Sequence, residues 1–148
     1  LYLSDDAGGH WQRVASLPFP FSSFAPGSLA INSRLLVAID ACANLQLSSD
    51  GGRHWATIVP PHASNGCTVS LNGEEIWLDC LASIAHSSDA GATWTSYTTN
   101  PGGVQLLTQP LEPIGPDNAI VSVGGSLWRT IDGGAHWTQT WPVLPGES

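Results

Sequence analysis

The 148-residue sequence contains neither lysine nor methionine and is poor in positive charge. Its four arginines stand against twelve acidic residues, and the formal net charge is −8 with neutral histidines. Proteins that follow nucleic-acid phosphates use clustered Lys and Arg, so this composition excludes a nucleic-acid partner. Since methionine is absent and residue 1 is leucine, we do not expect position 1 to be an unprocessed translation start.

Long apolar runs and helical periods are also absent. No stretch approaches the length of a membrane-spanning helix, so no membrane span is expected. No segment of twelve residues shows the apolar period of an amphipathic helix. Short β-rich segments bounded by Gly and Pro instead predict an all-β protein.

What the sequence does contain is the eight-residue pattern Ser/Thr-x-Asp-x-Gly-x-x-Trp, four times. We call the copies box 1 to box 4. Their defining residues are Ser4, Asp6, Gly8 and Trp11; Ser48, Asp50, Gly52 and Trp55; Ser87, Asp89, Gly91 and Trp94; and Thr130, Asp132, Gly134 and Trp137. Successive aspartates are 44, 39 and 43 residues apart. A nearly fixed period of this length is typical of a repeat architecture with one supersecondary unit per copy.

The pattern has the chemistry of a tight turn between two strands. The Asp can accept hydrogen bonds from the backbone N–H groups that follow it, and the Ser or Thr hydroxyl can bond the same backbone. The Gly supplies a positive φ at little steric cost. The Trp opens the next strand and can cover the hairpin with its ring. We therefore expect the box residues to be structural.

The four boxes resemble the Asp-box, or BNR repeat, of sialidase-like β-propellers. Similar boxes occur in sortilin-type receptors, in xyloglucan-active glycoside hydrolases and in assembly factors of photosystem II. The resemblance implies a propeller in which each box joins the third and fourth strands of a blade, away from the usual ligand face. It covers the whole chain and is specific for the fold, but it is unspecific for function.

Four-stranded antiparallel blades fit onto the sequence around the boxes. We expect one propeller segment over residues 1–148, divided into an outer half-blade at 1–16, blades at 26–59, 66–98 and 104–141, and a linker at 142–148. In the last blade we expect a first strand over 105–108 and a proline-containing loop over 109–117, since proline cannot belong to a central strand.

The expected total is about three and a half blades, whereas propellers close with roughly 4–8. We therefore expect the remaining blades as partners. They would come from the rest of a longer chain, or a second copy would complete a ring of about seven blades.

The cysteines allow one cross-strand disulfide. If the hairpin of the third repeat has a four-residue loop, Leu71 faces Ile76 and Cys67 lies opposite Cys80. A two-residue Asn-Gly loop would instead place Cys67 opposite Leu78, and small buried thiols are a further alternative.

Cys42, at the corresponding strand end one repeat earlier, would be left over or would compete for Cys67. A disulfide would indicate an exported protein, so we expect an extracellular or periplasmic location.

The histidines indicate no metal site. His10, His54 and His136 occupy the same position in three boxes, and blade equivalence should spread them around the rim as turn surface. His62 and His86 have no Cys or His neighbour at ligand spacing. One carboxylate per turn is too few for the roughly six to eight oxygens of a calcium site. We therefore expect no metal and no cofactor.

Catalysis would need charged groups that converge on the ligand face. The resemblance implies three arginines, a Tyr–Glu nucleophile pair and an Asp acid/base in sialidase-like enzymes. Here Arg53 lies in a box, Arg129 lies beside another, and Tyr2 and Tyr97 fall on expected outer strands. We do not expect an intact arginine triad.

A glycosidase needs two carboxyls about 5–9.5 Å apart. Asp40 and Asp79, at the ends of the second strands of adjacent blades, are the candidate pair. The alternative is that each caps its own turn. Glu74 and Glu75 lie in a hairpin turn and are expected to be solvated.

Seven tryptophans could provide sugar-stacking platforms. Four belong to boxes, and Trp77, in an inner strand, is expected to fill the space between blades. Only Trp128 and Trp141 remain free for a surface role. The sequence favours a non-enzymatic binding or scaffold module with a glycan or protein ligand. The alternative is part of a sialidase-like or other glycoside hydrolase.

Overall fold

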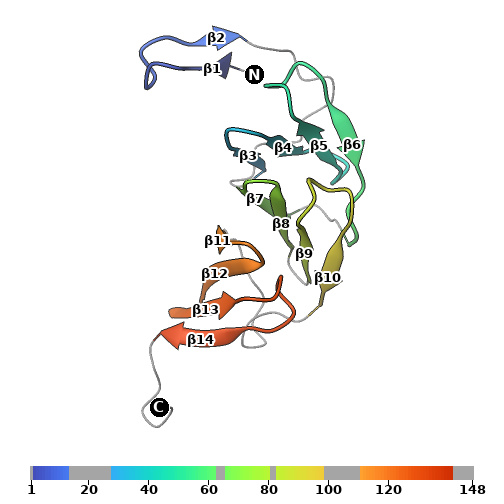
Figure 1. Ribbon diagram of the computed structural model, residues 1–148, viewed down its shortest axis with the longest axis vertical. Helices are drawn as coiled ribbons and strands as arrows, with labels where there is room; N and C mark the ends of the chain where they lie inside the picture. Colours follow the sequence, from blue (N-terminus) through green and yellow to red (C-terminus); the bar gives the residue numbers. More distant parts are fainter. Residues whose placement is uncertain (1, 14–27, 63–65, 81–82, 99–110, 142–148) are drawn as a thin grey trace.

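The computed structural model describes residues 2–13, 28–62, 66–80, 83–98 and 111–141. All regular structure in these ranges is β-strand, as the sequence predicts. The strands form one two-stranded and three four-stranded antiparallel sheets. The sheets follow one another in chain order along an arc (Figure 1). Within these described ranges, no helix is long and apolar enough to cross a membrane.

We call the two-stranded sheet the half-blade and the others blades 2, 3 and 4. The half-blade holds β1 (Tyr2–Leu3) and β2 (Gln12–Arg13). Blade 2 holds β3 (Leu29–Ile31), β4 (Leu36–Ile39), β5 (Leu45–Ser48) and β6 (Ala56–Ile58). Blade 3 holds β7 (Thr68–Asn72), β8 (Glu75–Cys80), β9 (Ser83–Ser87) and β10 (Thr95–Tyr97). Blade 4 holds β11 (Glu112–Gly115), β12 (Asn118–Val123), β13 (Ser126–Thr130) and β14 (Thr138–Trp141).

Each full blade is a simple meander, and its box connects the third strand to the fourth. The first strands β3, β7 and β11 of successive blades lie side by side (Figure 1). The linker expected at 142–148 lies outside the described residues.

The first strand of blade 4 is not the one that the sequence predicts. β11 runs over Glu112–Gly115, inside the expected loop, and residues 105–108 lie outside the described part of the chain. β11 is at the edge of its sheet, and its register with β12 shifts between Pro113 and Gly115. Proline removes one backbone donor, which an edge strand tolerates and a central strand does not. The prediction was wrong because it applied the rule for central strands to the whole sheet.

The apolar core lies between blades. One cluster between blades 2 and 3 includes Leu45, Ile76 and Leu78, and a second between blades 3 and 4 includes Trp77 and Val121. Successive residues of a strand point to opposite faces, so β8 supplies both clusters, and all six of its residues are buried. Trp77 is fully buried and fills the space between blades, as expected.

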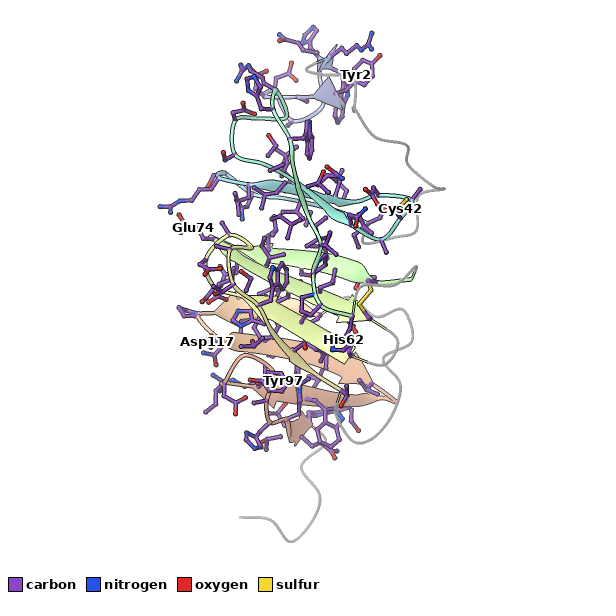
Figure 2. All side chains as sticks on the ribbon, turned by 90° about the vertical axis from the view of Figure 1, so that its right-hand side faces the viewer. Tyr2, Cys42, His62, Glu74, Tyr97 and Asp117 are labelled. Atoms are coloured by element: carbon purple, nitrogen blue, oxygen red, sulfur yellow. A yellow bond between two sulfur atoms is a disulfide. The ribbon has the colours of Figure 1, made fainter. Side chains whose placement is uncertain are left out.

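The hairpin of blade 3 has the register in which Leu71 faces Ile76. Cys67 and Cys80 form a disulfide with a sulfur–sulfur distance of 2.01 Å, drawn as a yellow bond in Figure 2. Cys42 is a free, exposed thiol. Figure 2 shows Cys42 at the edge of the blades opposite to the edge that carries Glu74 and Asp117.

Candidate functional site

The four boxes repeat one set of internal hydrogen bonds. The Ser or Thr hydroxyl donates to the Asp Oδ1 at 2.8–2.9 Å and accepts the Gly N–H at 2.8–3.0 Å. The same Oδ1 accepts the N–H of the residue before the Trp at 2.8–3.0 Å. In boxes 2, 3 and 4 the Trp Nε1 donates to the Gly carbonyl at 3.0–3.1 Å. The box aspartates are thus engaged inside their own turns.

The residue before each Trp completes the turn from its side chain. Nδ1 of His10, His54 and His136 lies 2.5, 2.5 and 2.7 Å from the Oδ2 of the box aspartate. In box 3 the hydroxyl of Thr93 donates to the equivalent oxygen of Asp89 at 2.6 Å. At this position, on the exposed surface of the turn, an imidazole or a hydroxyl therefore contacts the same carboxylate oxygen.

These bonds favour the ionised carboxylate. In Asp132 the backbone N–H of His136, followed by its ring, lowers the pKa from 3.8 to about 2. In Asp89 the hydroxyl and then the backbone N–H of Thr93 have the same effect, and the pKa is again about 2. Both carboxylates stay charged and bonded at neutral pH, which suits a structural role.

Asp40 is engaged in its own turn after β4. Its Oδ1 accepts the backbone N–H groups of Cys42 at 2.8 Å and Asn44 at 3.0 Å, and its Oδ2 accepts Nε2 of Gln46 at 2.8 Å. Burial alone would raise the pKa of Asp40, but these hydrogen bonds outweigh it and the pKa is lowered. This is the geometry of a turn-capping residue.

Asp79 lies within β8 in a different environment. The residue is 5% exposed, and its Oδ1 has no hydrogen-bond partner among the described residues. Desolvation raises its pKa from 3.8 to about 7.

The structure does not bring Asp40 and Asp79 together. Asp79 alternates with Leu78, so it lies on the face of blade 3 opposite to the cluster shared with blade 2. Leu45 belongs to that cluster, so Gln46, the partner of Asp40, lies on the far face of blade 2. The apolar cluster separates the two carboxyls.

Three of the four arginines have separate partners. Arg34 pairs with Glu74 at 2.9 Å, Arg53 donates to the Asp50 carbonyl at 2.9 Å, and Arg129 donates to Asn118 at 3.1 Å. Of the two tryptophans expected to be free, Trp128 packs against the cluster between blades 3 and 4, and Trp141 is 59% exposed.

Glu75 is buried, which corrects the expectation that it is solvated. It is 8% exposed, and its carboxylate accepts the N–H of Asp117 at 3.0 Å and Nε1 of Trp77 at 3.4 Å. Glu74, the next residue in the turn, is solvated as expected. The difference arises because Glu75 is on the face of β8 that blade 4 covers.

Next to Glu75 lies His86 of β9, whose ring stacks on Trp77 with centroids 4.1 Å apart. His86 Nε2 is 3.8 Å from Glu75 Oε2, and His86 Nδ1 is 3.7 Å from Asp117 Oδ1. Neither distance is a hydrogen bond, and Nε2 has no partner within the described residues. Burial lowers the pKa of His86, although the charges of Glu75 and Asp117 oppose the shift. These three residues could hold a cation.

His86 and Asp117 also line a pocket of about 280 Å³ between blades 3 and 4. Its other lining residues are Ser88, Thr93, Trp94, Thr95, Tyr97, Asp132 and Gly133. Since boxes 3 and 4 contribute to it, this pocket is on the box-bearing edge, whereas the resemblance implies a ligand face away from the boxes. Asp132 is held by its own box, so Asp117, with a side chain 57% exposed, is the carboxylate that remains available there.

Sequence reasoning missed this site because its members are far apart in the chain. A signal was present: β-strand pairing aligns Arg34, Glu74 and Asp117 as one turn position in three successive blades. The ion pair between Arg34 and Glu74 shows that such turns touch across blades. Aligning the repeats would therefore have placed Asp117 beside the turn that begins β8.

Comparison with known proteins identifies the fold. No family model matches the chain. A xyloglucanase from a Paenibacillus species is 25% identical over 126 residues, which are 81% of this chain and 12% of that protein.

Solved structures resemble the chain at lower identity. An enzyme of glycoside hydrolase family GH74 from Niastella koreensis matches with a TM-score of 0.66 at 19% identity, over 93% of this chain and 21% of that one. YCF48 from Cyanidioschyzon merolae matches with a TM-score of 0.60 at 20% identity, over 78% and 38%. YCF48 bound to D1 peptide matches with a TM-score of 0.57 at 20% identity, over 82% and 45%.

These neighbours are β-propellers, and the three four-stranded sheets with the half-blade are a segment of that fold, as the sequence predicts. The chain spans less than half the length of each of these proteins.

Proposed function

We propose that the chain is part of a sialidase-like Asp-box β-propeller that serves as a non-enzymatic binding or scaffold module. The observation that carries the proposal is the chemistry of the pocket between blades 3 and 4. It offers the hydroxyl of Ser88, the aromatic side chain of Tyr97 and one available carboxylate, that of Asp117, whereas the hydroxyls of Thr93 and Thr95 already donate to Asp89 and to the His86 carbonyl. Hydroxyls and aromatic rings suit recognition of a polar ligand, either a sugar or a peptide segment.

Hydrolysis of a glycosidic bond would require a second available carboxyl facing the same ligand. In the described pocket, the only other carboxylate is that of Asp132, which is engaged by Thr130 and His136. Binding without hydrolysis is therefore the function that this geometry supports best.

We also propose that further blades complete the propeller. They would add to the half-blade at 1–16, the blades at 26–59, 66–98 and 104–141, and the linker at 142–148. Blade 4 covers the apolar face of blade 3, yet its own Leu127 and Ile131 are 38% and 69% exposed. Trp11 of the half-blade is 63% exposed, whereas Trp94 and Trp137 pack against the clusters between blades. Such faces suit additional blades, from the same chain or another copy.

The location that we propose is outside the cytoplasm, extracellular or periplasmic. The disulfide between Cys67 and Cys80 supports it, since such bridges persist in oxidising compartments.

A second candidate function, part of a glycoside hydrolase, is favoured by two observations. The raised pKa of Asp79, about 7, is a property of a general acid. The relative at 25% identity is a xyloglucanase.

Two defined probes test the proposal on the purified chain by calorimetry: xyloglucan oligosaccharides and the D1 peptide named with the YCF48 structure. We expect one of them to bind without being cleaved, and Tyr97→Ala to weaken that binding. Exposed Tyr2→Ala, on the distant half-blade, is the matched control. Absence of binding to both probes, or cleavage of the oligosaccharide that Asp79→Asn abolishes, would contradict the proposal.

A further inference from the structure

We propose that Glu75, His86 and Asp117 form a binding site for one divalent transition-metal ion of the Zn²⁺ class, between blades 3 and 4. The sequence indicated no metal because His62 and His86 have no Cys or His neighbour at ligand spacing and the box histidines were expected to lie apart around the rim. The fold supplies what the spacing does not. The site shares His86 and Asp117 with the pocket of the proposed function, but metal binding is measured without any ligand in that pocket.

The three residues come from three segments that meet at the box-bearing edge. Glu75 begins β8, His86 lies in β9, and Asp117 occupies the turn between β11 and β12. Each offers one ligand atom, and these atoms all lie within 4.8 Å of one another. Ligands bound to one tetrahedral Zn²⁺ are roughly 3.4 Å apart, given metal–ligand distances near 2.1 Å. Side-chain shifts of about 1 Å would close the shell around an ion.

The second, independent observation is the state of the imidazole. The side chain of His86 is 5% exposed, and its Nε2 has no hydrogen-bond partner among the described residues. A buried polar atom without a partner is costly, so a native structure that keeps one calls for an unseen partner. The ring cannot easily turn away, because it stacks on fully buried Trp77. A cation bound at Nε2 would satisfy this atom beside Glu75 Oε2, 3.8 Å away, and the Asp117 carboxylate, which now lies nearest Nδ1, would turn toward the ion to complete the set.

The arrangement is specific to blade 3 and is not a general feature of the repeat. Strand pairing aligns Glu75 and His86 with Leu35 and Leu47 in blade 2. In blade 4 the aligned pair is Asn118 and Arg129, which bond to each other directly. In blade 2 an apolar pair therefore replaces Glu75 and His86, and in blade 4 they are replaced by a pair whose side chains are hydrogen-bonded to each other.

The donor set selects the class of metal. One imidazole nitrogen with two carboxylates suits Zn²⁺ and its neighbours, whereas Ca²⁺ and Mg²⁺ prefer oxygen ligands alone. Three protein ligands would leave a coordination position for water or for a ligand in the adjoining pocket, which His86 and Asp117 line.

Cobalt substitution tests the site, because four-coordinate Co²⁺ absorbs visible light and Zn²⁺ displaces it. We expect one Co²⁺ per chain with a visible absorption band, loss of that band in His86→Gln, and about tenfold or greater weakening in Asp117→Asn. Glu74→Gln is the matched control, since Glu74 is an exposed carboxylate at the equivalent turn position of blade 3. It should bind Co²⁺ like the wild type.

His10, His54, His62 and His136 remain in His86→Gln, so adventitious binding to them is measured directly. Should His86→Gln fail to fold, Asp117→Asn decides the question, because the Asp117 side chain is largely exposed. An unchanged band in either folded variant, or no band in the wild type at millimolar Co²⁺, would overturn the proposal.

Discussion

Asp79 differs from the other acidic groups because its carboxyl is buried and its Oδ1 has no hydrogen-bond partner among the described residues. Its pKa is raised to about 7 in the folded protein against 3.8 for the free group. Folding therefore favours the protonated form. The contribution of Asp79 to the free energy of unfolding is therefore fully present below about pH 4 and is lost as the pH rises through about 7.

Asp79→Asn should remove this pH dependence. We expect the unfolding free energy of the wild type, relative to the variant, to fall by about 4 kcal/mol between pH 4 and pH 8. Urea unfolding of both proteins across that range measures it. A difference that stays constant with pH would show that Asp79 is not buried as described.

Gly91 illustrates how tightly a box sits on the preceding blade. It has φ +87°, and a Cβ there would lie 2.7 Å from Cδ1 of Ile58 in blade 2. Gly73 also has a positive φ, +63°, but a Cβ there would meet no atom within 4 Å.

Gly91→Ala should therefore destabilise more than Gly73→Ala. Both variants lose the ease with which glycine adopts the left-handed backbone, roughly 1 kcal/mol, and only Gly91→Ala also forces the terminal methyl of Ile58 to shift, which adds about 1 kcal/mol. Chemical denaturation compares the two directly. Equal losses of unfolding free energy in the two variants would mean that box 3 does not pack closely against Ile58 of blade 2.

The hairpin of β7 and β8 is closed by a disulfide. The disulfide closes a short loop, since Cys67 and Cys80 are 13 residues apart. Constraining the unfolded chain in this way stabilises by about 3 kcal/mol.

The double variant Cys67→Ser/Cys80→Ser should lose about that amount of unfolding free energy, whereas Cys42→Ser should lose little, because Cys42 is exposed and unbridged. Denaturation with and without reductant checks both. If reductant leaves the midpoint of Cys42→Ser unchanged, the bridge does not contribute.

Most of the fold follows from local chemistry in the repeats. The boxes specify their turns through bonds within eight residues, so sequence alone predicts a hairpin at each. β11 was missed because its Pro113 is acceptable only at a sheet edge, and which strand lies at the edge is a property of the whole blade.

The candidate site could not be derived in the same way. Glu75, His86 and Asp117 meet only when blade 4 packs on blade 3, so their proximity is tertiary. The same packing buries Glu75, which a turn in isolation would expose.

As a whole molecule, the chain is expected to bind its ligand without hydrolysing it. The most direct measurement is the release of reducing ends from xyloglucan incubated with the purified chain. We predict none above the blank, because the described pocket has a single available carboxylate and the apolar cluster keeps Asp40 and Asp79 apart. Release that is lost in Asp79→Asn or Asp40→Ala, both folded, would contradict the account and identify a glycoside hydrolase.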